Sequence, residues 1–240
     1  MNPPSAPDRG NDTQLPAARP IVFIVDDDVS VRESLSLQMW NEGWQPETFA
    51  SAQEYLARSP VTVPSCLVLD IVLPGITGLE LQRLIADEWA VTPIIIITGY
   101  GDVPKTVQAM KAGAIEFLTK PLNDKLLLPA VRHALARSQS ALRHKAEFDK
   151  LQCCYAALTH REQQVMQLVV LGMPNKQVAE ELHISEITVK AHRGRVMQKM
   201  QADSLADLVK MAGRLQSGSG VRAARRSPDR FALPQQHSVA

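Results

Sequence analysis

Few features of this chain suggest an exported or membrane-bound protein. Its 240 residues contain only three cysteines, two of them adjacent (Cys153 and Cys154), which are too few for a disulfide framework. No apolar run approaches the roughly 20 residues that are needed to cross a bilayer. The first twenty residues also lack the apolar core of a secretory signal. We therefore expect a cytoplasmic protein that has no membrane partner.

The chain also has little net charge, but its charged residues are unevenly distributed. The formal net charge is +1, whereas residues 20–125 carry fourteen acidic and seven basic side chains. The remainder of the chain is basic on balance, and four of its arginines lie between residues 217 and 240. An acidic front and a basic back predict two domains with different partners, of which the second binds a polyanion.

Composition and periodicity predict an α/β domain that follows a disordered N-terminal tail and precedes a helical second half. Residues 1–20 are rich in Pro, Ser, Asn and Asp, which is typical of a disordered tail. From residue 21 to 138, short apolar runs alternate with amphipathic stretches. Such runs predict strands that are buried on both faces, as in a doubly wound parallel sheet covered by helices. We expect five strands, at 21–25, 45–49, 66–69, 93–97 and 114–118.

The second half of the sequence has a helical period throughout. Residues 139–157 predict a helical linker that continues the fifth helix of the first domain, and residues 216–240 predict a disordered basic tail. Residues 158–215 predict a small all-α domain, in which a short helix, a tight turn at 183–185 and a longer helix form a helix-turn-helix. The four helices are expected at 159–171, 175–182, 186–200 and 204–215.

Polar side chains follow four of the predicted strands. Because the carboxyl ends of parallel strands meet at one edge of the sheet, these side chains should gather where ligands bind. Each residue alone is better explained as a loop cap or a solvated turn, but the ordered set favours a phosphoryl-transfer site. Carboxylates from two strands need a cation, and oxygen ligands suit Mg²⁺, while a lysine can contact a phosphoryl group. The set consists of Asp26, Asp27, Asp70, Thr98 and Lys120.

Four segments of residues 21–138 form a recognisable set: VFIVDDD at 22–28, CLVLDIVLPGITG at 66–78, IIIITGYGD at 94–102 and AIEFLTKP at 114–121. With these segments, residues 21–138 resemble the receiver domain of two-component response regulators. The resemblance implies that Asp70 is the phosphoacceptor and that the Lys120–Pro121 bond is cis. It also implies a set of metal ligands and a set of switch positions. The Mg²⁺ ligands are Asp26, Asp27, Asp70 and the backbone carbonyl of Val72, and the switch and phosphoryl contacts are Thr98, Phe117 and Lys120.

Three further positions refine this interpretation. Asp28 lies outside the metal-binding pair and is expected to start a helix. Leu73 and Val72 depart from the family's usual Met and basic residue, without consequence for the chemistry, because position 72 contributes its backbone. A phosphatase with an aspartyl-phosphate intermediate would need an aspartate as general acid at position 72, so we do not expect an enzyme. Another alternative, a receiver that dimerises without phosphorylation, is disfavoured because the carboxylate set is complete.

The segment LTHREQQVMQLVVLGMPNKQVAEELHISEITVKAHRGRVMQKM at 158–200 is similar to the LuxR-type DNA-binding domain. On its longer helix, Val189, Val196 and Met200 share an inward stripe, and small and basic residues occupy the other side. Taken alone, that side could be an ordinary solvated face; the resemblance assigns it to DNA. Lys190 and Ala191 would face bases, although Gly194 replaces a lysine that some relatives have there. Candidates for backbone or base-edge contacts are Thr188, His192, Arg193 and Arg195.

The two resemblances together point to the FixJ branch of response regulators. They imply a phosphorylation-activated transcriptional regulator whose Asp70 accepts a phosphoryl group from a cognate sensor histidine kinase. Phosphorylation would promote a receiver homodimer, which places two helix-turn-helix domains on double-stranded DNA. RNA polymerase is the further partner that this function implies.

Overall fold

The computed structural model describes residues 19–86, 91–99 and 103–225. The chain divides into two compact units, Met1–Arg143 and His144–Ala240. Residues 1–18 of the predicted N-terminal tail, and residues 226–240 of the predicted C-terminal tail, lie outside the described residues.

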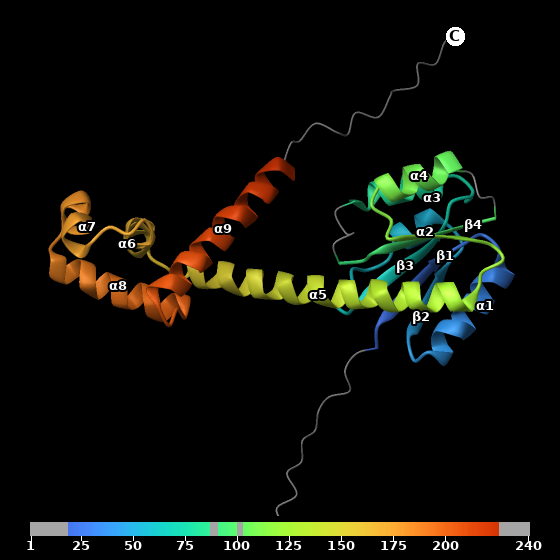
Figure 1. Cartoon of the computed structure of the whole chain (residues 1–240), viewed down its shortest axis with the longest axis horizontal. Coiled ribbons are helices and arrows are strands. Elements are labelled where there is room, and N and C mark those ends of the chain that lie inside the picture. Colours follow the sequence, from blue (N-terminus) through green and yellow to red (C-terminus); the bar gives the residue numbers. More distant parts are fainter. Residues whose placement is uncertain (1–18, 87–90, 100–102, 226–240) are drawn as a thin grey trace, which may run out of the picture. The chain divides into compact units, whose positions relative to one another are not determined.

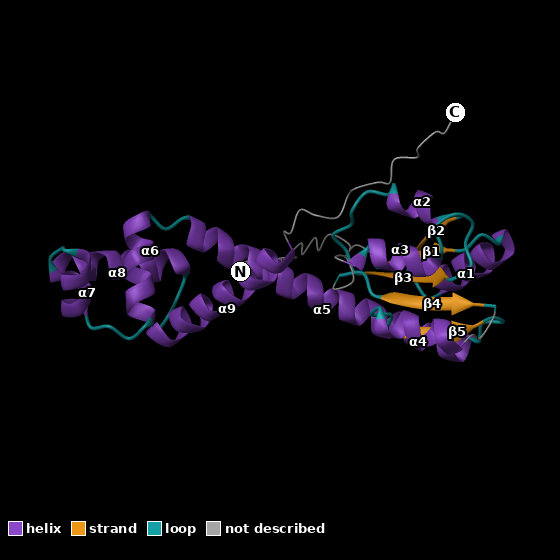
Figure 2. Ribbon diagram, turned by 90° about the horizontal axis from the view of Figure 1, so that it is seen from above, coloured by secondary structure: helices purple, strands orange, loops and turns teal. Residues whose placement is uncertain are grey.

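The first unit is built on a five-stranded parallel sheet, which confirms the predicted fold class (Figure 2). Its strand order is β2-β1-β3-β4-β5. The strands β3 and β4 each run on to a polar residue, Asp70 and Thr98, so these side chains belong to the strand ends themselves. The strands are β1 (Ile21–Val25), β2 (Gln45–Phe49), β3 (Ser65–Asp70), β4 (Ile94–Thr98) and β5 (Glu116–Thr119).

Helices cover both faces of this sheet (Figure 1). Successive strand residues point to opposite faces, so Phe23 and Leu67 enter one core while Ile24 and Val68 enter the other. The first core packs against α2 (Ala52–Leu56), α3 (Gly78–Leu84) and α4 (Val103–Lys111). The second packs against α1 (Val29–Asn41) and the first half of α5 (Asp124–Ala156). Burial on both faces explains why the strands read as continuous apolar runs.

Short-range signals set the ends of several helices. The Asp28 carboxylate accepts the Ser30 N–H at 2.8 Å and caps α1, which confirms its expected role. Thr77 and Glu80 form a capping box at the start of α3. The chain leaves α1 and α4 through glycines with positive φ, Gly43 at +82° and Gly113 at +96°.

In its described residues, the second unit contains the end of α5 and four further helices. These are α6 (His160–Val170), α7 (Asn175–Leu182), α8 (Glu186–Met200) and α9 (Leu205–Arg225). The predicted inward stripe of α8 is confirmed, because Val189, Val196 and Met200 are at most 1% exposed. They pack in one core with Val165 and Val169 of α6, so α6 supports the buried side of the helix-turn-helix. Within the described residues, no helix is both long and apolar enough to span a bilayer.

The last helix is longer than the sequence predicts. We expected it to end at Leu215 and the tail to be disordered from residue 216, but α9 continues to Arg225. The Ser217 hydroxyl donates to the Gly213 carbonyl at 3.0 Å, one turn earlier, so the serine does not stop the helix. Each glycine in the Ser-Gly-Ser-Gly segment costs only about 1 kcal/mol relative to Ala, and the residues that follow are good helix formers.

Candidate functional site

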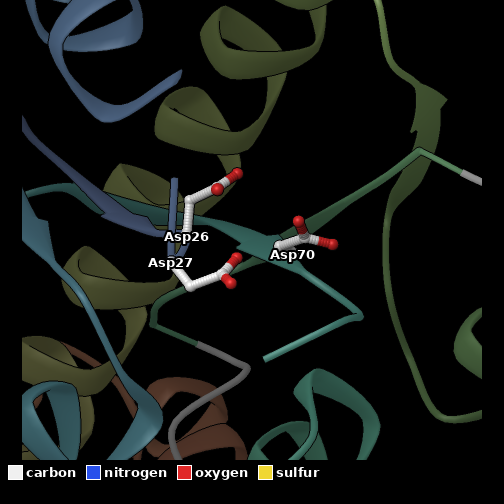
Figure 3. Close-up of side chains that lie close together, drawn as sticks. All are labelled: Asp26, Asp27 and Asp70. Carbon is white, nitrogen blue, oxygen red and sulfur yellow. The ribbon is translucent and has the colours of Figure 1, made fainter. Parts of the chain in front are cut away.

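Three aspartate side chains meet at the carboxyl ends of β1 and β3 (Figure 3). Val25 pairs with Leu69 in the sheet, so the residues that follow them, Asp26 and Asp70, lie side by side. Asp26 is fully buried and Asp70 is 4% exposed, whereas Asp27 is exposed. One carboxylate oxygen from each of the three aspartates lies within 4.8 Å of the others. The structure therefore brings the predicted carboxylates together.

Lys120 supplies the positive charge in this cluster. Its Nζ lies 2.6 Å from Oδ2 of Asp26 and 2.6 Å from Oδ2 of Asp70. Its backbone N–H donates to the Thr98 carbonyl at 2.7 Å, and the bond to Pro121 is cis, as expected. Burial lowers the pKa of the Lys120 ammonium, but the two carboxylates outweigh burial and the net pKa is raised. Lys120 therefore carries its charge at neutral pH.

The electrostatics of the cluster favour a divalent cation. Burial raises the pKa of Asp26, and the hydrogen bonds from Lys120 and the Asp28 backbone N–H only partly offset that effect. The cluster thus contains three carboxylates that are desolvated to different degrees, and the one ammonium contacts two of them, Asp26 and Asp70. The donors are all oxygens, which is the ligand type that Mg²⁺ prefers. The three carboxylates lie close enough together to share one ion, so the residues present fit Mg²⁺.

The remaining predicted positions of the first unit lie on the neighbouring strands. Oδ1 of Asp70 accepts the backbone N–H of Val72 at 3.0 Å, which fixes the orientation of the carboxylate. Thr98 is 2% exposed and follows Ile97, the residue of β4 that pairs with Asp70. Phe117 is half-buried against the core on the face covered by α3 and α4. Thr98 and Lys120 thus flank Asp70 from β4 and from the end of β5.

Gly78 is part of this site, although sequence reasoning assigned it no role. Its N–H donates to the Ile71 carbonyl at 3.0 Å. A Cβ at position 78 would lie 2.1 Å from the backbone oxygen of Asp70, so only glycine allows the start of α3 to approach that loop. The signal in the sequence was a glycine in the first turn of a capped helix, where it weakens the helix.

The recognition helix α8 presents some of its predicted DNA-contacting residues to solvent and holds others against the protein. Lys190, Ala191 and Arg195 are exposed. Thr188 is half-buried and its hydroxyl lies 2.8 Å from that of Ser185, the residue that caps α8. The exposed three form a face that a ligand can reach directly.

Two further predicted residues of α8 lie closer to the protein. Arg193 is half-buried and donates to Oδ1 of Asn175, at the start of α7, at 3.0 Å. His192 is also half-buried, and its Nδ1 has no hydrogen-bond partner among the described residues. Asn175, which sequence reasoning missed, therefore positions one guanidinium of the recognition helix.

A buried carboxylate connects α6 to α8. Glu162 is 2% exposed, and its Oε2 accepts the Thr159 N–H at 2.8 Å and the Lys199 ammonium at 2.7 Å. Lys199 also donates to the Ala157 carbonyl at 3.1 Å. Hydrogen bonds from Lys199 and from the Thr159 N–H lower the pKa of Glu162 to about 2. The pair holds the recognition helix against α6 through side chains far apart in sequence.

Both units match known protein families. Residues 22–132 match the response regulator receiver domain, and residues 156–212 match the bacterial regulatory proteins of the luxR family. The chain is 47% identical to Nodulation protein W of Bradyrhizobium diazoefficiens over 196 residues, which cover 82% of this chain and 86% of that protein. It is 40% identical to the transcriptional regulatory protein FixJ of Rhizobium meliloti, over 80% of this chain and 94% of that protein.

A solved structure supports the same assignment. The response regulator StyR is 45% identical, with a TM-score of 0.74, over 82% of this chain and 100% of that chain. The relatives named FixJ agree with the predicted branch. The chain therefore belongs to the two-component response regulators that combine a receiver domain with a LuxR-type DNA-binding domain, and it is a transcriptional regulator of that class.

Proposed function

We propose that phosphorylation of Asp70 switches this regulator from a weak to a strong DNA-binding form. The proposal is based mainly on the groups that surround Asp70, a lysine and two further carboxylates, in a chain that also contains a helix-turn-helix. The Asp70 carboxylate ends a buried strand, accepts the Val72 N–H and contacts the Lys120 ammonium. Two further carboxylates lie beside it.

The phosphoryl donor in this proposal is a phosphohistidine of the cognate sensor histidine kinase. An oxygen of Asp70 attacks phosphorus, the P–N bond breaks, and the imidazole leaves with the electron pair and takes up a proton. An acyl phosphate on Asp70 results. The hydrogen bond from Val72 orients the nucleophilic carboxylate, and Lys120 offsets charge on the incoming phosphoryl oxygens.

Asp26, Asp27, Asp70 and the backbone carbonyl of Val72 would hold Mg²⁺. When bound, the ion neutralises negative charge on the carboxylates and on the phosphoryl oxygens. The all-oxygen donor set within 4.8 Å supports this assignment. The Val72 N–H and the Lys120 ammonium then keep the carboxylates oriented, and burial of Asp26 keeps water away from its carboxylate.

Phosphorylation adds a charge of about −2 beside Thr98 and Lys120. Both groups can turn toward the new oxygens, and Phe117 then occupies the space that Thr98 leaves. We propose that this repacking favours a receiver homodimer. The dimer brings two recognition helices to two half-sites on double-stranded DNA. The regulator then acts in the cytoplasm and recruits RNA polymerase to the bound DNA. Lys190 and Ala191 would face bases. Further contacts to the backbone or base edges would come from Thr188, His192, Arg193 and Arg195.

The test is DNA binding by the full chain before and after incubation with acetyl phosphate and Mg²⁺. We expect the donor to strengthen binding by the wild type and to leave Asp70→Asn unchanged. Asp28→Asn is the matched control: asparagine caps a helix as well as aspartate, so this variant should respond like the wild type. A response of Asp70→Asn equal to that of the wild type, or an Asp70 without an acid-labile adduct in mass spectrometry, would contradict the proposal.

A further inference from the structure

Ile187 is a large apolar side chain that the fold leaves in solvent. It is 81% exposed, the largest fraction among the exposed large hydrophobic residues of the described part of the chain. It lies in the first turn of α8, directly after Glu186. A single exposed apolar residue is ordinary on a protein surface, so exposure alone does not indicate a function for Ile187. Its place on the recognition helix does.

Ile187 begins a stripe on the outer side of the recognition helix. Ala191 and Gly194 follow it at helical spacings of four and seven residues, and both are exposed. A Cβ at position 194 would meet no other described atom within 4 Å, so the surface around it is open. The stripe is therefore shallow at Ala191 and Gly194, where another surface can come close to the backbone, and only Ile187 protrudes from it.

The charges beside this stripe indicate what covers it. Lys190 and Arg195 are exposed and lie on opposite flanks of the stripe. An occupant of complementary chemistry is anionic along both rims and offers an apolar group between them. The major groove of DNA has this arrangement, because phosphates line its edges and the C5-methyl group of thymine projects from its floor. Residues in the N-terminal turns of a recognition helix are those that reach base edges.

We propose that Ile187 is a specificity-determining residue that packs against the C5-methyl group of a thymine in the major groove. The inference rests on the DNA-binding function proposed above and adds the base that this position selects. Isoleucine has no hydrogen-bonding group, so it distinguishes bases only by apolar contact. Cytosine has only a hydrogen at C5, so it offers no methyl group for this contact, and its C4 amino group beside that position would lack an acceptor. Cytosine would therefore be disfavoured.

The test removes one methyl group at a time from the DNA. Double-stranded DNA is first selected from a random pool by the full-length wild type with acetyl phosphate and Mg²⁺. Each thymine of the selected duplex is then replaced by deoxyuridine, and binding is measured for the wild type and for Ile187→Ala. For the wild type we expect deoxyuridine to lower the DNA affinity about fourfold at one thymine per half-site, which is the value of one buried methyl group. At that thymine, deoxyuridine should not change the affinity of Ile187→Ala. The affinity of Ile187→Val should fall nearly as much as that of the wild type.

Leu171→Ala is the matched control, because Leu171 is 77% exposed and lies at the end of α6, outside the recognition helix. It should show the full deoxyuridine effect. An identical deoxyuridine effect in wild type and Ile187→Ala at every thymine overturns the proposal. So does an Ile187→Ala variant that keeps its DNA affinity and loses only binding to RNA polymerase or to a second copy. A pool that yields no common sequence for the wild type overturns sequence-specific DNA binding itself, and the inference with it.

Discussion

The ion pair between Glu162 and Lys199 should make the stability of the DNA-binding unit depend on pH. The pKa of Glu162 is lowered from 4.5 to about 2, first by Lys199 and then by the Thr159 N–H. A group with a lowered pKa in the folded state stabilises the protein above its unfolded pKa. This stabilisation is lost as the pH falls from about 4.5 toward 2.

The size of the effect follows from the shift and from the exposure of the partner. Such a shift corresponds to about 3 kcal/mol of folding free energy. The Lys199 side chain is 36% exposed, so solvent screens part of the attraction, and we expect about 2 kcal/mol. Glu162→Gln should therefore lower the free energy of unfolding of the second unit by about 2 kcal/mol at pH 7. The difference from the wild type should fall to about half or less at pH 3.

The measurement must report on the second unit alone. All three tryptophans (Trp40, Trp44 and Trp89) precede residue 144, so fluorescence reports on the receiver instead. Urea unfolding of the full chain, followed by the NMR amide signals of α6 and α8, gives the required free energies. A destabilisation that is as large at pH 3 as at pH 7, or one below 0.5 kcal/mol at pH 7, would refute the reasoning.

Asp149→Asn provides the matched control for this prediction. Asp149 also pairs with a lysine, Lys145, at 3.2 Å, but both side chains are well exposed. Pairs of this kind contribute at most about 0.5 kcal/mol, so the variant should unfold close to the wild type at both pH values.

Two further substitutions test contacts within the receiver. Gly78→Ala places a Cβ 2.1 Å from the Asp70 backbone oxygen, so it should destabilise the receiver by about 3 kcal/mol and slow its labelling by acetyl phosphate. Ser138→Ala removes a buried hydroxyl that accepts the Ser65 N–H at 2.9 Å and donates to the Val91 carbonyl. It should cost about 1–3 kcal/mol and speed hydrogen exchange at the Ser65 amide.

Matched controls exist for both substitutions. Gly213→Ala lies on α9, where a Cβ meets no described atom within 4 Å, and it should leave the receiver unchanged. Ser140→Ala is exposed on α5 and should leave exchange at Ser65 unchanged. Normal labelling of Gly78→Ala, or slow exchange at Ser65 in Ser138→Ala, would show that the contact in question does not have the role described.

Features that act over a few residues were predictable. Asp28 starts a helix as expected, because its carboxylate accepts the N–H of Ser30, two residues ahead. The helix expected from residue 159 begins at His160, because the Thr159 side chain accepts the N–H of Glu162. The helix end expected at Leu215 was wrong because it followed from a weak local signal: glycines and serines lower helix stability but do not block the next hydrogen bond.

The sequence by itself determined the parallel sheet and the gathering of Asp26, Asp70 and Lys120 at one edge of it. Burial on both faces makes each strand a continuous apolar run, which is typical of parallel strands between helices, and the carboxyl ends of such strands share an edge. Only the tertiary structure decided that position 78 must be glycine and that Glu162 is paired. These contacts join residues that no periodicity links, because they depend on how closely packed elements approach one another in space.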